Sequence, residues 1–285
     1  MNFTNLNIPF NESQKSISFN LVQTEIKKEK FFIGRLSGNE TRLCGLFVNN
    51  KNITTDLYQN MLFGAGIQFK TVDDLTQYVK MYNTSVKNTT LLGIWDGGMY
   101  KQAKEYYDYL NNITLNKICA HGLEPYYFMD EPTYKCIPHK KILIITSHKE
   151  TTLSQLPNLN KIYNKPIFDN AEFYIYKPAQ QNAGSHDTNS WQFHYNNMKQ
   201  ELADIKKTFN FDIALVSAGG FGMPLCNYIY TELNTSTIYV GGALQLFFGI
   251  MGKRWANNNM NSFWVKTLMV DKPLNTQLCE GSCYW

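Results

Sequence analysis

Two apolar segments that end in glycine-rich turns most constrain the fold of this chain. Residues 211–216 lead into Ser217-Ala-Gly-Gly-Phe-Gly222, and Pro224 then opens a helical pattern. Residues 237–240 lead in the same way into Gly241-Gly-Ala-Leu-Gln245. A buried strand, a tight glycine turn and a helix N-terminus direct backbone N–H groups outward, as in phosphate-binding α/β proteins. The pattern predicts two neighbouring turns at one edge of a parallel sheet, and a nucleotide or sugar-nucleotide site there.

The rest of the chain repeats this alternation of strand and helix. Apolar runs predict strands at 31–35, 91–95, 115–120, 141–146, 172–176, 212–216 and 237–240. Helical patterns lie at 13–30, 41–48, 55–62, 72–82, 99–110, 151–163, 191–209, 223–233 and 243–249. Such alternation predicts an α/β fold with a Rossmann-like, mostly parallel sheet and helices on both faces.

The 285 residues allow two kinds of domain organisation. The chain is either a single α/β domain over residues 1–285 or two lobes, at about 13–125 and 139–285. Residues 125–138 contain three prolines and several aromatic residues, which is typical of a connector.

Charge and hydropathy argue against two classes of partner. The net charge of +4 is spread along the chain, and its densest basic run, Lys27 to Lys30, is typical of a solvated helix end, so nucleic-acid binding is not expected. No run approaches about 18 apolar residues, so no transmembrane helix is expected. Residues 1–14 lack the pattern of a signal peptide.

The six scattered cysteines are typical of reduced core residues and favour a cytoplasmic location. Cys279 and Cys283 have no matching Cys or His pair nearby, so a zinc site is not expected. A composition rich in Asn, Lys, Ile and Tyr is typical of AT-rich genomes, such as those of large DNA viruses or low-GC bacteria. For a virus, the location would be the host cytoplasm.

Ligands of open parallel sheets bind beyond the carboxyl ends of the strands. The turns expected to meet there are Arg35–Glu40, Thr146–Lys149, Ser217–Gly222 and Gly241–Gln245. The first of them has two interpretations. Ser37 and Glu40 have the spacing of a helix capping box. Alternatively, Arg35 pairs with a diphosphate and Glu40 holds a divalent cation or a ribose hydroxyl.

The glycine turns also have two interpretations. Gly219, Gly220 and Gly222 would let a ligand approach the backbone, or would only let a helix pack closely on a strand. Gly241 and Gly242 repeat the pattern, followed by Gln245, which would hydrogen-bond a base or a sugar hydroxyl, or else face solvent.

Other candidates are basic or titratable residues. Lys253 and Arg254 would bind phosphates, or would be a surface pair beside Trp255. His148 follows the clearest predicted strand, where a general base would lie, although such a histidine is often only a turn residue. Glu124 stands beside aromatic residues, as in sugar sites and in connectors.

Several of these segments together resemble the GT-D-type glycosyltransferases and a related group of proteins associated with polysaccharide biosynthesis. The resemblance rests on residues 32–40, 124–127, 140–145, 211–220, 241–250, 252–255 and 280–285. It implies a Rossmann-like fold that transfers a sugar from a nucleotide donor. The family signature is Arg-x-Gly-Asp-x-Glu, whose two acidic residues serve a divalent metal and the donor diphosphate.

In this chain the signature is incomplete. Arg35 matches the arginine and Glu40 the glutamate, whereas Ser37 replaces the glycine and Gly38 stands at the first acidic position. With one carboxylate lost, affinity for Mn²⁺ or Mg²⁺ is expected to fall.

The resemblance therefore implies a glycosyltransferase that uses a nucleotide-sugar donor and a glycan or glycoconjugate acceptor. Arg35 and Arg254 would neutralise the departing nucleoside diphosphate, next to Ser37, Asn39 and the glycine turns. Glu40 would hold a metal or the donor sugar, and His148 or Glu124 would act as general base. The alternatives are an inactive sugar-nucleotide-binding or structural protein of the same fold, and a Rossmann-like methyltransferase.

Overall fold

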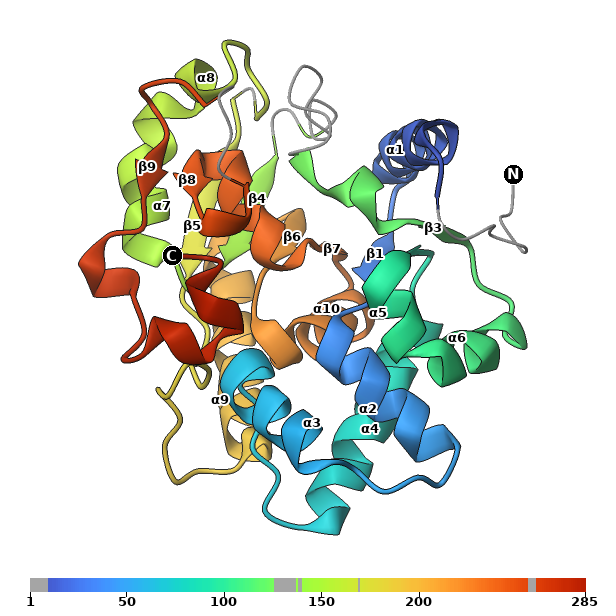
Figure 1. The fold of residues 1–285 in the computed structure, drawn as a ribbon. Coiled ribbons are helices and arrows are strands. Elements are labelled where there is room, and N and C mark those ends of the chain that lie inside the picture. The colour runs from blue at the N-terminus through green and yellow to red at the C-terminus, as the bar shows by residue number, and fades with distance from the viewer. Residues whose placement is uncertain (1–9, 126–136, 138–139, 169, 256–259) are drawn as a thin grey trace.

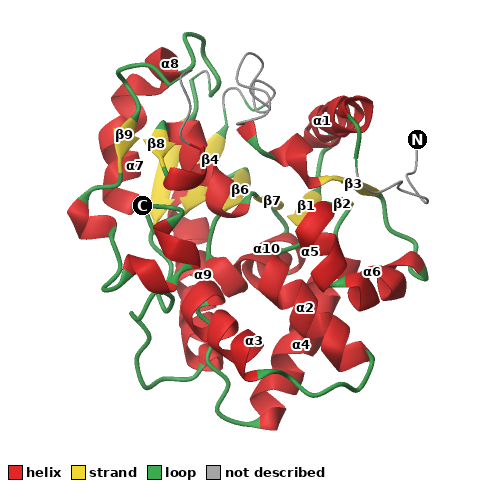
Figure 2. Ribbon diagram, viewed as in Figure 1, coloured by secondary structure: helices red, strands yellow, loops and turns green. Residues whose placement is uncertain are grey.

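The protein is built around one seven-stranded parallel sheet, as the computed structural model shows (Figures 1 and 2). The structure describes residues 10–125, 137, 140–168, 170–255 and 260–285, so most of the 125–138 connector lies outside the described residues. The strand order is β3-β2-β1-β7-β6-β4-β5, and every neighbouring pair is parallel. The predicted α/β, Rossmann-like fold is confirmed.

The strands of this sheet are short. They are β1 (Phe32–Arg35), β2 (Leu91–Ile94), β3 (Lys117–Cys119), β4 (Lys141–Ile145), β5 (Glu172–Tyr176), β6 (Ile213–Val216) and β7 (Ser236–Tyr239). A separate parallel pair is formed by β8 (Ile250–Met251) and β9 (Val265–Lys266).

The α-helices are α1 (Glu12–Ile26), α2 (Gly38–Val48), α3 (Thr55–Asn60), α4 (Val72–Lys87), α5 (Gly97–Gln102), α6 (Lys104–Asn111), α7 (Lys149–Gln155), α8 (Leu159–Ile162), α9 (Trp191–Phe209) and α10 (Gly222–Thr231). A π-helix, η1 (Met61–Ala65), continues α3. The 3-10 helices are η2 (Ala120–Leu123), η4 (Leu156–Asn158), η5 (Gly219–Phe221), η6 (Gly241–Phe248), η7 (Lys253–Trp255), η8 (Met269–Asp271), η9 (Thr276–Leu278) and η10 (Glu280–Ser282).

Each strand contributes side chains to two hydrophobic cores, one on each face of the sheet. Successive side chains of a strand point to opposite faces. In β6, Ala214 and Val216 therefore enter the core beneath α2, α4, α9 and α10, whereas Ile213 and Leu215 enter the core beneath α1, α8 and η6. Because both faces are covered by helices, strands β2, β4 and β6 are nearly continuous apolar runs, as expected for a parallel sheet.

A crevice opens at the carboxyl ends of β1 and β7, which are neighbours in the sheet. The chain leaves β1 through α2, on one face, and leaves β7 through η6, on the other face. Adjacent strands whose connections diverge in this way leave a space between the first turns of the two helices, and ligands of open α/β sheets bind there.

Three predicted helices differ from the observed elements. The helix expected at 99–110 is divided into α5 and α6, because Ala103 adopts a non-helical backbone conformation (φ −124°). The helix expected at 151–163 is interrupted by η4 around Pro157, which lacks the N–H needed to continue an α-helix. The segment expected as a helix at 243–249 is the 3-10 helix η6.

Cys44, Cys119, Cys226, Cys279 and Cys283 form no disulfide in the described part of the chain. Within the same residues, no helix combines the length and the apolar character needed to cross a bilayer.

The first turn of α10 offers a test of the packing between helix and sheet. A Cβ added at Gly222 would overlap the ring of Tyr239. We expect Gly222→Ala to lower the free energy of unfolding by about 1–3 kcal/mol, because the buried ring would have to move. Urea unfolding measures this change.

The matched control is Gly98→Ala in α5, where an added Cβ would meet nothing within 4 Å. It should be neutral, or stabilising by up to ~1 kcal/mol, because alanine favours helix over glycine. Equal losses in the two variants would contradict the packing explanation.

Candidate functional site

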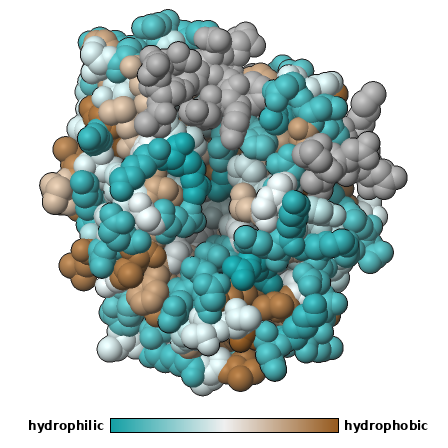
Figure 3. Space-filling view, viewed as in Figure 1, coloured by the Kyte–Doolittle hydropathy of each residue, from teal (hydrophilic) through white to brown (hydrophobic). Residues whose placement is uncertain are grey.

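A cavity of about 950 Å³ lies at the carboxyl edge of the sheet. Segments that follow all seven strands contribute to its wall, together with residues of η1 and of the C-terminal segment. The surface in Figure 3 is hollowed near the centre of the view, with hydrophilic residues around the opening. Ligand pockets in proteins measure ≈ 300–1,000 Å³, so this cavity has room for a molecule as large as a nucleotide sugar.

Most of the predicted site residues meet in this cavity. Those that line it are Arg35, Ser37, Asn39, Glu40, Glu124, His148, Gly219, Gly241, Gly242, Gln245 and Arg254. Gly220, Gly222 and Lys253 do not line it. The four turns expected to converge at this edge of the sheet therefore do so.

Arg35 and Gly241 make the contact that joins the early and late segments. A Cβ at position 241 would overlap the Arg35 guanidinium, so only glycine fits there, and Gly241 also has a positive φ of 65°. The Arg35 side chain is buried and donates from Nη1 to the Glu124 carboxylate at 2.8 Å. Its guanidinium carbon lies 5.1 Å from the centre of the Trp95 ring. The arginine is thus held in a fixed position at the cavity wall.

Arg254 is held in a similar way at another part of the wall. Its guanidinium pairs with the Glu280 carboxylate and lies 5.0 Å from the centre of the Tyr284 ring. Its Nη1 also lies 3.3 Å from the Tyr284 hydroxyl. Each of the two arginines predicted to bind the diphosphate, Arg35 and Arg254, therefore already has a carboxylate partner.

The balance of charge differs from the expected cationic site. The lining contains three arginines, Arg35, Arg42 and Arg254, and four carboxylic acids, Glu40, Asp96, Glu124 and Glu280. When all are ionised, the described lining carries one negative charge. A diphosphate that entered would have to share the arginines with their carboxylates, because no surplus positive charge is present.

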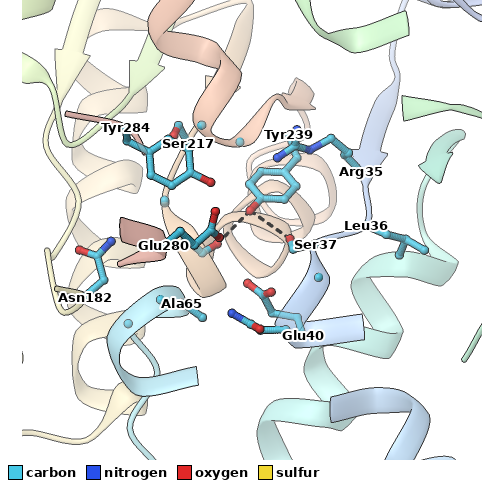
Figure 4. A pocket seen from close by; sticks show the side chains of 18 of the residues that line it. Arg35, Leu36, Ser37, Glu40, Ala65, Asn182, Ser217, Tyr239, Glu280 and Tyr284 are labelled. Atoms are coloured by element: carbon cyan, nitrogen blue, oxygen red, sulfur yellow. Dashed lines mark hydrogen bonds between the residues drawn. The ribbon is translucent and has the colours of Figure 1, made fainter. Parts of the chain in front are cut away.

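Glu40 is the carboxylate of this set that is both deeply buried and without a hydrogen bond to another described residue. Its exposed fraction is 4%, and its side chain extends into the cavity (Figure 4). Burial raises the pKa of Glu40 to about 7, and the facing Glu280 charge adds to this effect, whereas its own backbone N–H and Arg35 oppose it. Glu40 can therefore gain or lose a proton near neutral pH.

The capping box predicted for Ser37 and Glu40 does not form. Ser37 is at the N-cap position of α2, but its side chain makes no capping hydrogen bond. Its Oγ lies 3.3 Å from the Tyr239 hydroxyl, which donates to the carbonyl of Gly219 at 3.0 Å (Figure 4). Tyr239 thereby links the turns after β1 and β6, and Glu40 remains available to a ligand.

Packing accounts for several of the other glycines. A Cβ at Gly220 would meet Ile67 and Tyr78, outside the cavity. At Gly242, which lines the cavity, an added Cβ would overlap the Tyr284 ring. The alternative in which these glycines let chain segments pack closely therefore describes Gly220, Gly222 and Gly242.

Neither of the two residues predicted as general base, His148 and Glu124, has a pKa and surroundings that suit this role well. Burial lowers the pKa of His148 to about 4, so its imidazole is neutral at pH 7, and Nδ1 lies 3.2 Å from the Thr267 hydroxyl. Burial raises the pKa of Glu124, but this carboxylate is already bound to Arg35. A catalytic group works best with a pKa near the working pH, so Glu40 suits proton transfer better than either.

A tightly held divalent cation does not fit the donor set. Hard cations need clustered anionic oxygens. Gly38 contributes no carboxylate, and Glu124 and Glu280 are bound to arginines. Among the described residues, no three His, Cys, Asp or Glu side chains are grouped to hold a metal.

Four buried polar atoms of residues that line the cavity have no hydrogen-bond partner in the described part of the protein. They are the donors Arg35 Nε, Gln180 Nε2 and Trp285 Nε1 and the acceptor Gln245 Oε1. Buried polar atoms are nearly always paired, so these four indicate where a ligand with both acceptor and donor groups would bind.

Trp255 was predicted to stack on a ring of the ligand, and it lines the cavity, but no role in the site was predicted for Trp95, Tyr239, Glu280, Tyr284 or Trp285. Trp95 directly follows β2 and Tyr239 ends β7, so their positions at strand ends were a usable signal. Glu280, Tyr284 and Trp285 reach the cavity because the C-terminal segment folds back onto it, and no local pattern predicts that contact.

Comparisons with protein-family models, with curated proteins and with solved structures found no match to this chain.

The buried Glu40 carboxylate should make stability depend on pH. Its pKa of about 7 in the folded chain exceeds the ordinary 4.5, so between these values the folded protein keeps a proton that the unfolded chain releases. The contribution of Glu40 to stability therefore falls as the pH rises from 4.5 to about 7. We expect Glu40→Gln to be more stable than the wild type at pH 8 by up to about 3 kcal/mol, and to lose this advantage below pH 4.5.

Urea unfolding at several pH values measures the difference. The exposed Glu29, changed to Gln, serves as the control and should show no such trend. A stability difference for Glu40→Gln that is the same at every pH would show that Glu40 has no raised pKa.

Proposed function

We propose that this protein binds a nucleotide-diphosphate sugar in the cavity and transfers the sugar to a glycan or glycoconjugate acceptor. The observation that carries the proposal is the position and chemistry of the cavity. It lies where the connections that follow β1 and β7 diverge, and unpaired donors and an unpaired acceptor line it on separate segments. Open α/β sheets bind nucleotides at this position.

The lining suits a ligand rich in hydroxyl groups. Gln245 Oε1 is an available acceptor, and Arg35 Nε, Gln180 Nε2 and Trp285 Nε1 are available donors. Glu40 accepts when it is ionised and donates when it is protonated. The rings of Trp95, Tyr239, Trp255, Tyr284 and Trp285 supply flat apolar surface in the same wall. Few polar groups set among aromatic side chains are typical of sites for small organic molecules.

In this proposal the diphosphate lies near Arg35 and Arg254, which share their charge between it and their carboxylate partners. Glu40 takes or gives the proton that is exchanged with a ligand hydroxyl, because its pKa is near neutrality. The sugar-nucleotide-binding protein without transfer activity and the methyltransferase remain the competing functions.

A ligand screen separates these functions. UDP-, GDP- and dTDP-sugars and S-adenosylmethionine, each with and without Mn²⁺, are tested for an increase in melting temperature. We expect a nucleotide sugar to stabilise the fold and to be hydrolysed slowly. Stabilisation without turnover would favour the binding protein, and stabilisation by S-adenosylmethionine alone would favour the methyltransferase.

Trp285 offers a conservative test of the site itself. Trp285→Phe removes the Nε1 donor but keeps an aromatic ring, so we expect the Kd of the stabilising nucleotide sugar to rise by about 2- to 10-fold, the value of one hydrogen bond. Isothermal titration calorimetry measures it.

The control is Trp264→Phe. Trp264 is a buried tryptophan whose Nε1, like that of Trp285, has no partner in the described structure, but it does not line the cavity. Its substitution should leave the Kd unchanged. Equal effects of the two substitutions would place the ligand elsewhere.

A further inference from the structure

The C-terminal segment brings a second carboxylate into the cavity by an unusual backbone route. Glu280, Gly281 and Ser282 all have left-handed conformations, with φ of 47°, 62° and 65°. Residues other than glycine rarely adopt this conformation, and such residues cluster at functional sites. The turn directs Glu280 toward the space that Glu40 also faces, beside the Tyr239 hydroxyl (Figure 4).

Specific contacts hold this segment in place on both sides of Glu280. Gln245 Nε2 donates to the carbonyl of Tyr284 at 3.1 Å, and the Arg254 N–H donates to the carbonyl of Cys283 at 3.3 Å. The absence of a side chain at Gly252 is needed as well, because a Cβ there would lie 2.6 Å from the Cys283 oxygen. The Ser282 hydroxyl donates to Thr276 Oγ1 at 2.8 Å. The position of Glu280 is therefore well defined by the fold.

The surroundings of Glu40 contain little positive charge. The titratable and charged groups that act on it are Cys44 of α2, Tyr78 and Tyr82 of α4, Tyr239 of β7, Glu280 of the C-terminal segment and Arg35 of β1. Of these only Arg35 is positive, and it is bound to Glu124. Two carboxylates that face the same space, one of them deeply buried, do not both ionise readily.

The environments of the two carboxylates differ in a way that decides which one keeps the proton. The Glu280 side chain is 44% exposed and pairs with Arg254, so its ionised form is solvated and partly neutralised. Glu40 is almost fully buried and has no such partner among the described residues. The negative charge is therefore placed on Glu280 and the proton on Glu40.

We propose that Glu280 is a positioning residue of the site, whose ionised carboxylate adds to the effect of burial in favouring protonated Glu40, so that Glu40 donates a hydrogen bond to an oxygen of the ligand. The inference rests on the proposed function only for the identity of that ligand. A protonated Glu40 leaves three carboxylates against the three lining arginines. With Glu40 protonated the lining has no net charge, so a phosphate or sugar oxygen can bind at pH 7 without a bound cation to offset a negative charge.

The test measures the titration of Glu40 in the ligand-free protein, by ¹³C NMR of protein labelled at the glutamate side-chain carboxyl. The Glu40 signal is assigned by its loss in Glu40→Gln. We expect it to titrate near pH 7 in the wild type and, in Glu280→Gln, to shift toward the ordinary 4.5. Glu280→Asp, which restores the charge, should return the midpoint toward the wild-type value.

Arg254→Gln should shift the titration midpoint of Glu40 in the opposite direction. It removes the charge that neutralises Glu280, so the Glu40 midpoint should rise above the wild-type value. If both substitutions merely loosened the C-terminal segment, both would move the midpoint in the same direction. A midpoint that does not move in Glu280→Gln, or that moves in the same direction in Glu280→Gln and Arg254→Gln, would overturn the proposal.

The exposed Glu29→Gln serves as the control and should leave the Glu40 signal unchanged. If Glu280→Gln does not fold, the direction of the shift in Arg254→Gln alone decides the question. Because no nucleotide sugar is added, a failure of this inference is distinct from a failure of the proposed sugar transfer, which the ligand screen decides separately.

Discussion

The buried ion pair between Arg35 and Glu124 joins the parts of the molecule that form the cavity. Arg35 ends β1, Glu124 follows β3, and the guanidinium occupies space that only a glycine at 241, after β7, leaves free. Removing one partner of such a pair typically costs about 3–5 kcal/mol, because the remaining charge is left buried and unpaired. Three strand ends are thus held together by one contact. The same ion pair partly neutralises the Arg35 charge, which would otherwise attract a diphosphate.

A second ion pair gives the C-terminal segment its place in the site. Arg254 and Glu280 meet beside Tyr284, whose ring fills the space left by Gly242. With both arginines partnered, the cavity resembles a site for a hydroxyl-rich, aromatic-stacking ligand more than a simple anion site. The protonation of Glu40 then decides whether the lining is neutral or negative. Recognition of a charged ligand would therefore depend on pH as well as on shape.

The regular elements followed from local patterns in the sequence. Helix α9 covers residues 191–209 as predicted, because its apolar side chains recur with the helical period and face one core. The strands were recognisable because both of their faces are buried, as in Ile213–Val216. The interruptions at Ala103 and Pro157 were not predicted. Proline can start as well as break a helix, and nothing in the sequence around Ala103 signals its non-helical backbone.

The sequence by itself determined the parallel sheet, the edge at which its loops meet, and the presence there of Arg35, Glu40 and the glycine turns. These depend on periodicity and on the rule that parallel strands end on the same side. Only the tertiary structure decided what each group contacts. Glu124 pairs with Arg35, and Glu280 faces Glu40. The Ser37 hydroxyl contacts the Tyr239 hydroxyl and does not cap α2. The physical reason is that the charge and the pKa of a group depend on burial and on neighbours distant in sequence, which appear only when the chain has folded.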